Sequence, residues 1–130
     1  MKTYLITGGA GFIGSNYIHY LMQKHREDIR ILNLDALTYC GRRENVSCYE
    51  DSGTYQFING DICDETLLER IFTENTIDYV VHFAAHSHVD RSISSPGEFA
   101  LVNVYGTLNL LEAARRAWEE DYEHKRFLYI

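Results

Sequence analysis

The sequence predicts an α/β fold, a doubly wound parallel sheet with helices on both of its faces. Short apolar runs typical of buried strands alternate with longer stretches whose apolar residues recur at the helical period. The first apolar run stops at three glycines, Gly8, Gly11 and Gly14, and a helical pattern opens directly after them. Because right-handed crossovers connect such elements, we expect five parallel strands in the order 3-2-1-4-5.

The first half of the chain predicts three strands and one helix. The runs of strand type are residues 3–6, 29–35 and 55–58, and the helix covers residues 12–25. Between the second and third strands, residues 36–53 are polar and form the longest irregular stretch.

The second half predicts two helices and two strands. Asp64 or Thr66 can cap a helix whose apolar face carries Leu67, Leu68, Ile71 and Phe72. Residues 77–84 form a nearly continuous apolar run, as expected of a strand buried on both faces. Pro96 suits the first turn of a helix with an apolar stripe at Phe99, Val102, Gly106, Leu110, Leu111, Ala114 and Trp118.

Residues 127–130 open a fifth strand, and the sequence stops there. A fifth strand without a following helix leaves apolar surface uncovered on one face of the sheet. We therefore expect residues 1–130 to form one domain that is the N-terminal part of a longer protein, truncated after strand 5.

Composition excludes several classes of protein. The 130 residues are 45% hydrophobic and 24% charged, which is typical of a soluble globular domain. The net charge is −7 without a block of Lys or Arg, which argues against nucleic acid or a membrane surface as partner. No apolar run has the length of a membrane span, and no signal-peptide pattern is present. The three cysteines have no ligand spacing, so we interpret them as reduced thiols of a cytoplasmic protein.

The glycines after the first strand favour a nucleotide site. Without a Cβ atom the backbone can turn tightly and approach a pyrophosphate, and the helix N-terminus adds free N–H groups. The spacing is Gly-x-x-Gly-x-x-Gly, which only partly meets the Gly-x-Gly-x-x-Gly fingerprint of dinucleotide-binding Rossmann domains. The pattern alone leaves an ordinary glycine turn open.

Asp35 ends the second strand about 20 residues after the glycines, the separation expected of a ribose-binding acid. A carboxylate there accepts hydrogen bonds from the ribose hydroxyls and repels a 2′-phosphate, so the predicted cofactor is NAD and not NADP. The alternative is a strand-end Asp that satisfies a turn. Asp61, after the third strand, is a weaker candidate for the adenine side, with a turn or cap as its alternative.

Two further patterns point to other chemistry. His86, His88 and Asp90 fit a His-x-His-x-Asp pattern that can mark a zinc hydrolase, but Arg91 stands where a further ligand is expected. His82 is interpreted as a core or sheet-face histidine. Tyr20 and Lys24 have the Tyr-x-x-x-Lys spacing of a proton-transfer pair, yet they follow the glycine loop directly, so we interpret them as helix-surface residues.

These segments together resemble the extended short-chain dehydrogenase/reductase family, and within it the dTDP-glucose 4,6-dehydratases. Four stretches carry the resemblance along all 130 residues. They are Thr7-Gly8-Gly9-Ala10-Gly11-Phe12-Ile13-Gly14, Asp35-Ala36-Leu37-Thr38-Tyr39 with Gly41, Gly60-Asp61-Ile62, and His82-Phe83-Ala84-Ala85 running into Ser87-His88-Val89-Asp90-Arg91-Ser92, extended by Asn103, Gly106 and Thr107.

The resemblance implies which residues contact the ligands. It places the pyrophosphate, ribose, adenine and nicotinamide of NAD against Gly8, Gly11, Phe12, Ile13, Gly14, Asp35, Ala36, Leu37, Thr38, Asp61, Ile62, Phe83, Ala84, Ala85 and Ser87. It places the sugar against His86 and Ser87. The family usually has Glu where His86 stands and Thr where Val102 stands, so the contacts at these two positions differ from the usual pattern.

The resemblance also implies a reaction: dehydration of a nucleotide-linked glucose, with hydride taken from C4 and returned to C6 and water lost across C5–C6. The family's catalytic Thr, Asp-Glu pair and Tyr-x-x-x-Lys follow the fifth strand, so no catalytic residue is assigned here. We expect the 130-residue chain to be inactive alone and to bind NAD weakly if at all, and the parent enzyme to be a homodimer. A related sugar-nucleotide epimerase or decarboxylase and a non-catalytic NAD-binding module stay open.

Overall fold

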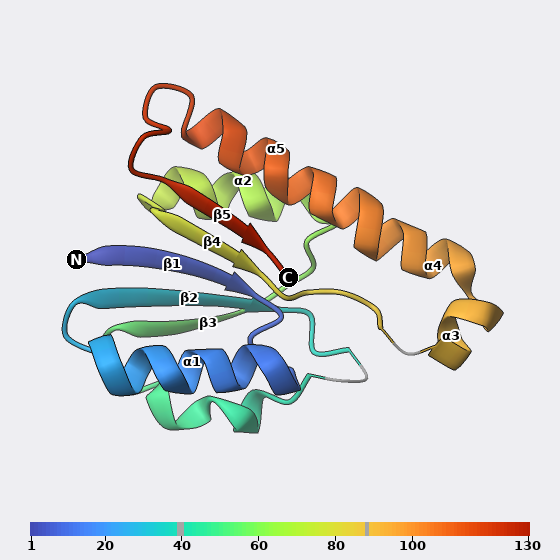
Figure 1. Cartoon of the computed structure of the whole chain (residues 1–130), viewed down its shortest axis with the longest axis horizontal. Helices are drawn as coiled ribbons and strands as arrows, with labels where there is room; N and C mark the ends of the chain where they lie inside the picture. Colours follow the sequence, from blue (N-terminus) through green and yellow to red (C-terminus); the bar gives the residue numbers. More distant parts are fainter. Residues whose placement is uncertain (39–40, 88) are drawn as a thin grey trace.

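The computed structural model describes residues 1–38, 41–87 and 89–130 and shows a single sheet between two layers of helices (Figure 1). The strands of the sheet are β1 (Lys2–Thr7), β2 (Ile29–Asp35), β3 (Tyr55–Asn59), β4 (Tyr79–His82) and β5 (Arg126–Tyr129). The helices are α1 (Phe12–His25), α2 (Glu65–Glu74), α3 (Val89–Ser94), α4 (Pro96–Ala100) and α5 (Thr107–Ala117).

All neighbouring strands pair in parallel, in the order β3-β2-β1-β4-β5, which confirms the predicted topology. Helix α1 and two short 3₁₀ turns (Arg43–Asn45 and Ser47–Tyr49) lie on one face, and α2 and α5 lie on the other (Figure 1). The carboxyl ends of all five strands therefore point to the same edge of the sheet. In open α/β sheets this edge is where ligands bind.

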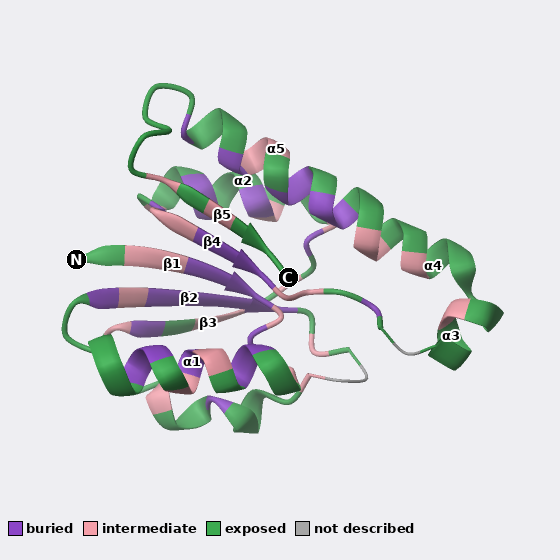
Figure 2. Cartoon of the chain, viewed as in Figure 1, coloured by how far each residue is buried: buried purple, intermediate pink, exposed green. Residues whose placement is uncertain are grey.

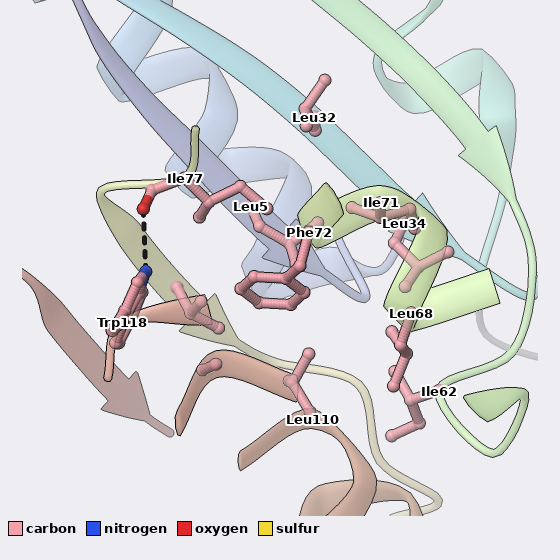
Figure 3. Close-up of a cluster of buried hydrophobic side chains, with 12 residues drawn as sticks. Leu5, Leu32, Leu34, Ile62, Leu68, Ile71, Phe72, Ile77, Leu110 and Trp118 are labelled. Carbon is pink, nitrogen blue, oxygen red and sulfur yellow. Dashed lines mark hydrogen bonds between the residues drawn. The ribbon is translucent and has the colours of Figure 1, made fainter. Parts of the chain in front are cut away.

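The two faces of the sheet have separate hydrophobic cores (Figure 2). Leu5, Leu32 and Val80 pack against α2 and α5, where the indole of Trp118 donates a 2.9 Å hydrogen bond to the carbonyl of Ile77 (Figure 3). On the other face, residues of β1, β2 and β4 pack against α1, and Ile18 is fully buried there. Both cores contain residues of β1 and β4, the two strands at the centre of the carboxyl edge.

Strand β4 is shorter than the predicted run of residues 77–84. Its partner β1 ends at Thr7, because Gly8 has φ +71° and leaves the extended conformation of a strand. The amide of Phe83 still bonds to Thr7, but the residues that follow have no strand beside them on that side. They leave the sheet and become available for the site.

The last predicted helix is interrupted. Between α4 and α5 the helix continues through a π-helical segment, Leu101–Gly106, in which each turn holds about one extra residue. The apolar stripe did not predict this segment, because a π turn changes the helical period only locally. Helix α3 was not predicted either, since its six residues are too few to establish a period.

Replacing Asp64 with alanine is expected to lower the free energy of unfolding by about 1 kcal/mol. Asp64 is the N-cap of α2, and its side chain accepts a 3.1 Å hydrogen bond from the amide of Leu67. Thr66, the alternative cap in the sequence, lies exposed inside the helix, so Thr66→Ala is the matched control and should change stability by less than about 0.5 kcal/mol. Urea denaturation measures both; equal losses would contradict the capping role.

The far edge of the sheet carries exposed apolar side chains. Leu128, Tyr129 and Ile130 are 51%, 56% and 59% exposed, and β5 has a neighbour on only one side. This is the uncovered apolar surface expected of a fifth strand without a following helix. Among the residues that the structure describes, no helix is long and apolar enough to cross a membrane.

Candidate dinucleotide site

A cleft of about 410 Å³ opens at the carboxyl edge of the sheet, between the glycine loop, the end of β2 and the segment that follows β4. This volume is in the range of small-molecule and cofactor sites. Every sequence-predicted contact residue except Leu37 lines it. The lining consists of Gly8, Gly11, Phe12, Ile13, Gly14, Leu34, Asp35, Ala36, Thr38, Gly41, Gly60, Asp61, Ile62, Phe83, Ala84, Ala85, His86, Ser87, Val102 and Ile130.

The glycine loop forms the floor of the cleft. Gly8 has φ +71°, and a Cβ there would lie 2.6 Å from the amide nitrogen of Ala84. A Cβ on Gly14 would collide with the carbonyl of Gly8. Helix α1 starts immediately after Gly11, with no side-chain cap and no acidic residue in its first turn. Its first N–H groups and its positive dipole end are therefore left for an anion.

Asp35 satisfies a turn, one of the two alternatives that the sequence offered, and it also lines the cleft. It is 8% exposed, and its carboxylate accepts 2.8 Å hydrogen bonds from the amides of Ala10 and Leu37. The first bond holds the glycine loop to the end of β2, and the second closes a turn. A carboxylate has about four lone-pair sites, so two remain for ribose hydroxyls in the cleft that Asp35 lines.

Leu37 is placed differently from its neighbours. Its backbone has φ +54°, a left-handed conformation that is unusual for a leucine, and its side chain does not line the cleft. Only its amide serves the site, through Asp35. Tyr39 and Cys40 lie outside the described residues.

Asp61 and Ile62 form the wall beyond β3. The carboxylate of Asp61 accepts a 2.8 Å hydrogen bond from the amide of Cys63, so Asp61 closes a turn while lining the cleft. Ile62 is buried beneath the π-helical segment, where a Cβ on Gly106 would lie 2.6 Å from its side chain. The glycine allows the helix to approach this wall closely.

The segment of residues 83–87 forms the opposite wall, and Asn103 fixes its backbone. The Asn103 side chain accepts a 2.8 Å hydrogen bond from the amide of His86 and donates a 2.9 Å bond to the carbonyl of His86. The His86 ring is 7% exposed, packs edge-on against Phe99, and has Nδ1 3.9 Å from Glu98. His86 therefore lines the cleft with its ring largely buried.

Sequence reasoning missed a buried network beneath these walls. Thr7 Oγ1 lies 2.6 Å from Nδ1 of His82, and Nε2 of His82 lies 2.8 Å from Oγ1 of Thr107. His82 is fully buried, as expected of a core histidine, and burial lowers its pKa to about 4. The partners were not foreseen, although Thr7 and His82 both end their strands and lie in register.

The other two candidate sites stay apart from the cleft. Tyr20 and Lys24 are exposed on α1 and do not line it. Within residues 1–38, 41–87 and 89–130, no three His, Cys, Asp or Glu side chains gather as metal ligands. His88 of the zinc pattern lies outside the described residues.

A second groove, of about 440 Å³, runs between α2 and α5. Three carboxylates, Glu65, Glu69 and Glu112, line it with one guanidinium, that of Arg116. No glycine loop borders it, and its carboxylates would repel a pyrophosphate. The first cleft is therefore the better candidate for a dinucleotide site.

Comparisons with known proteins show which proteins the chain is similar to. A family model described as GDP-mannose 4,6 dehydratase matches residues 5–130. The dTDP-glucose 4,6-dehydratase of Neisseria meningitidis serogroup B is 46% identical over 134 residues, covering 100% of this chain and 37% of the relative. The dTDP-glucose 4,6-dehydratase 1 of Escherichia coli K12 is 46% identical over 114 residues, covering 88% and 31%. The chain thus spans about a third of the length of these relatives.

Solved structures give the same relation. The dTDP-glucose 4,6-dehydratase of Bacillus anthracis, in complex with NAD, matches with a TM-score of 0.82 and 36% identity over 99% of this chain and 37% of that one. The UDP-glucose 4-epimerase of Thermotoga maritima, with UDP-glucose, matches with a TM-score of 0.82 and 32% identity over 98% and 37%.

Proposed function

Because this chain belongs to the GDP-mannose 4,6 dehydratase family, with dTDP-glucose 4,6-dehydratases among its relatives, we propose that its cleft is the NAD site of a sugar-nucleotide 4,6-dehydratase. One observation carries the proposal: the side-chain-free floor formed by Gly8 and Gly14 meets the carboxylate of Asp35 in a single cleft. The NAD-bound relative from Bacillus anthracis supports the same cofactor.

The residues of the cleft fit NAD in chemistry as well as in position. The loop and the first turn of α1 would hold the pyrophosphate, and Asp35 the adenosine ribose. Asp61 and Ile62 would flank the adenine. The carboxylate of Asp35 would repel the 2′-phosphate of NADP, so NAD is the preferred form.

Residues 83–87 would border the nicotinamide and the sugar. NAD, when bound, supplies an acceptor and donor of hydride. The chain's own contribution is to position these residues: Asn103 holds the backbone of His86, and His86 and Ser87 both line the cleft. The proposed substrate is a nucleotide-linked glucose, dTDP-glucose, which loses water across C5–C6 without net oxidation.

We assign the complete enzyme to the lyases and to the cytoplasm, and the 130-residue chain to its cofactor-binding N-terminal domain. The chain supplies no catalytic acid, base or nucleophile in this scheme, so it should be inactive alone. The test is to assay this chain and the complete protein of the parent reading frame with dTDP-glucose deuterated at C4. The complete protein should give a 4-keto-6-deoxy sugar with deuterium at C6, detected by mass spectrometry. Turnover by the 130-residue chain alone would refute the scheme.

The second candidate function is epimerisation of a sugar nucleotide. The specific observation in its favour is the match with the Thermotoga maritima UDP-glucose 4-epimerase. The same assay with UDP-glucose separates the two: an epimerase returns the C4 epimer and loses no water. A complete protein that binds NAD and converts neither substrate would instead be a non-catalytic NAD-binding module.

A stripe of exposed apolar side chains on the helix that runs from α4 to α5 fits a second copy of the protein. Leu101, Val104, Leu108 and Leu111 recur every three or four residues and are 50%, 68%, 53% and 44% exposed. We propose this stripe as the homodimer surface of the parent enzyme.

Replacing Leu108 with glutamate should therefore weaken the dimer of the complete protein by at least about tenfold, because the charge would be buried unpaired. Sedimentation velocity measures the change. Ile93→Glu is the matched control, since Ile93 is 76% exposed on α3, outside the stripe. If both variants sediment like the unmodified dimer, the stripe is not its interface.

A further inference from the structure

The buried imidazole of His82 connects three separate parts of the cleft. Its Nδ1 faces the hydroxyl of Thr7, the last residue before the glycine loop, and its Nε2 faces the hydroxyl of Thr107, the first residue of α5. The ring itself ends β4, directly before the wall of residues 83–87. It also stacks on Tyr129, with ring centroids 5.0 Å apart and planes 18° from parallel.

The hydrogen bonds fit a ring that is protonated at Nε2. The hydroxyl of Thr7 also accepts a 3.2 Å hydrogen bond from the amide of Ala84, so its own proton is available for Nδ1 of His82. When Thr7 uses this proton, Nδ1 is the acceptor, and Nε2 carries the ring proton and donates it to Thr107. The chain of bonds runs in one direction, from Ala84 through Thr7 and His82 to Thr107.

The same series of hydrogen bonds connects the glycine loop and the wall after β4, which lie close together. A Cβ on Gly8 would come within 2.8 Å of the Ala84 Cα, so the backbone of the glycine loop lies directly against the backbone of the wall after β4. The π-helical segment makes a second connection to that wall through the hydrogen bonds of Asn103, four residues before Thr107. A shift of the His82 ring would move the loop and the wall relative to each other.

We infer that His82 is a positioning residue of the cofactor cleft, which ties the glycine loop and the start of α5 to the wall of residues 83–87 through a neutral imidazole protonated at Nε2. The inference rests on the proposed function only in treating the cleft as the NAD site. It goes beyond that function, because His82 is buried beneath the cleft and touches no ligand position.

Four variants of the 130-residue chain test this role. His82→Phe keeps a flat ring for the stack on Tyr129 and removes both hydrogen bonds. Thr7→Val removes one hydroxyl with little change of shape, and Thr7→Ser restores it. Asp64→Ala is the matched control, because it destabilises the chain without touching the network.

The readouts are NAD affinity, followed by titration of the ¹⁵N-labelled chain, and the ring ¹⁵N shifts of His82. His82→Phe and Thr7→Val should weaken NAD binding by at least about tenfold, while Thr7→Ser and Asp64→Ala should stay within about twofold. The ring shifts should show an imidazole protonated at Nε2 alone. A folded His82→Phe chain with unchanged NAD affinity, or a ring protonated at Nδ1, would overturn the inference.

Failure of the proposed function has a different outcome. If NAD shifts only amides of the groove between α2 and α5, the cofactor assignment is wrong, and the ring tautomer together with the amide shifts of Gly8 and Ala84 still tests the positioning role. These two amides should move in His82→Phe and Thr7→Val and stay in place in Asp64→Ala. If His82→Phe does not fold, Thr107→Val, which removes only the bond to Nε2, replaces it in the same comparison.

Discussion

Replacing Gly14 with alanine is expected to abolish NAD binding and to destabilise the domain. A Cβ at this position would collide with the carbonyl of Gly8 and lie 2.8 Å from the Cα of Gly9. Both obstacles are backbone atoms, so no side chain can rotate away and the loop itself must shift. We expect a loss of about 1–3 kcal/mol in the free energy of unfolding and at least about 100-fold in NAD affinity.

Gly97→Ala is the matched control for this variant. Gly97 lies in the first turn of α4, and a Cβ there would meet no heavy atom within 4 Å. Its effect on stability should be within about 0.5 kcal/mol, and NAD affinity should be unchanged. Urea denaturation and NAD titration measure both quantities. A Gly14→Ala chain that binds NAD as well as Gly97→Ala does would show that the loop does not carry the pyrophosphate.

The second large effect is a loss of stability in mild acid, caused by His82. Burial lowers the pKa of His82 from 6.5 to about 4, so the unfolded chain takes up the proton first as the pH falls. The stability is therefore fully present above about pH 6.5 and is lost progressively down to about pH 4, by about 3 kcal/mol in total. Urea denaturation at several pH values across this window measures it.

The carboxylate of Asp78 affects the free energy of unfolding at a lower pH than His82 does. The amide of Thr3 and the ammonium of Lys125 lower the pKa of Asp78 below 3.8, so its stabilisation is lost only at more acidic pH. His82→Phe, which cannot take up the proton, should remove most of the pH dependence between 6.5 and about 4. His124→Gln, at an exposed position, is the control and should retain it. A flat profile in the unmodified chain would contradict the burial of a neutral His82.

The order of the strands could be predicted because apolar runs of strand type alternate with helical stretches. Right-handed crossovers between such elements give the order 3-2-1-4-5. Helices α1 and α2 were also predicted, since their apolar residues follow the 3.6-residue period and Asp64 caps α2. The comparisons confirm the predicted family, with relatives 46% identical to this chain. These features depend on patterns that are local in the sequence.

The remaining features depend on contacts between distant segments. The strand β1 beside β4 ends where Gly8 takes a positive φ, and the π-helical segment brings Asn103 to His86. The network through His82 joins Thr7 to Thr107, and no local pattern links these two residues. The gathering of the predicted contact residues in one cleft followed from the topology, whereas the roles of those residues toward a cofactor stay predictions.

The most direct test of the account is a titration of the ¹⁵N-labelled 130-residue chain with millimolar NAD and, separately, with NADP. NAD should cause weak, saturable shifts of the amides of the glycine loop, of Asp35, of Ile62 and of residues 83–87, because these line one cleft. NADP should bind more weakly by at least about tenfold, because its 2′-phosphate would face Asp35. Shifts confined to the groove between α2 and α5 would contradict the assignment of the cleft as the NAD site.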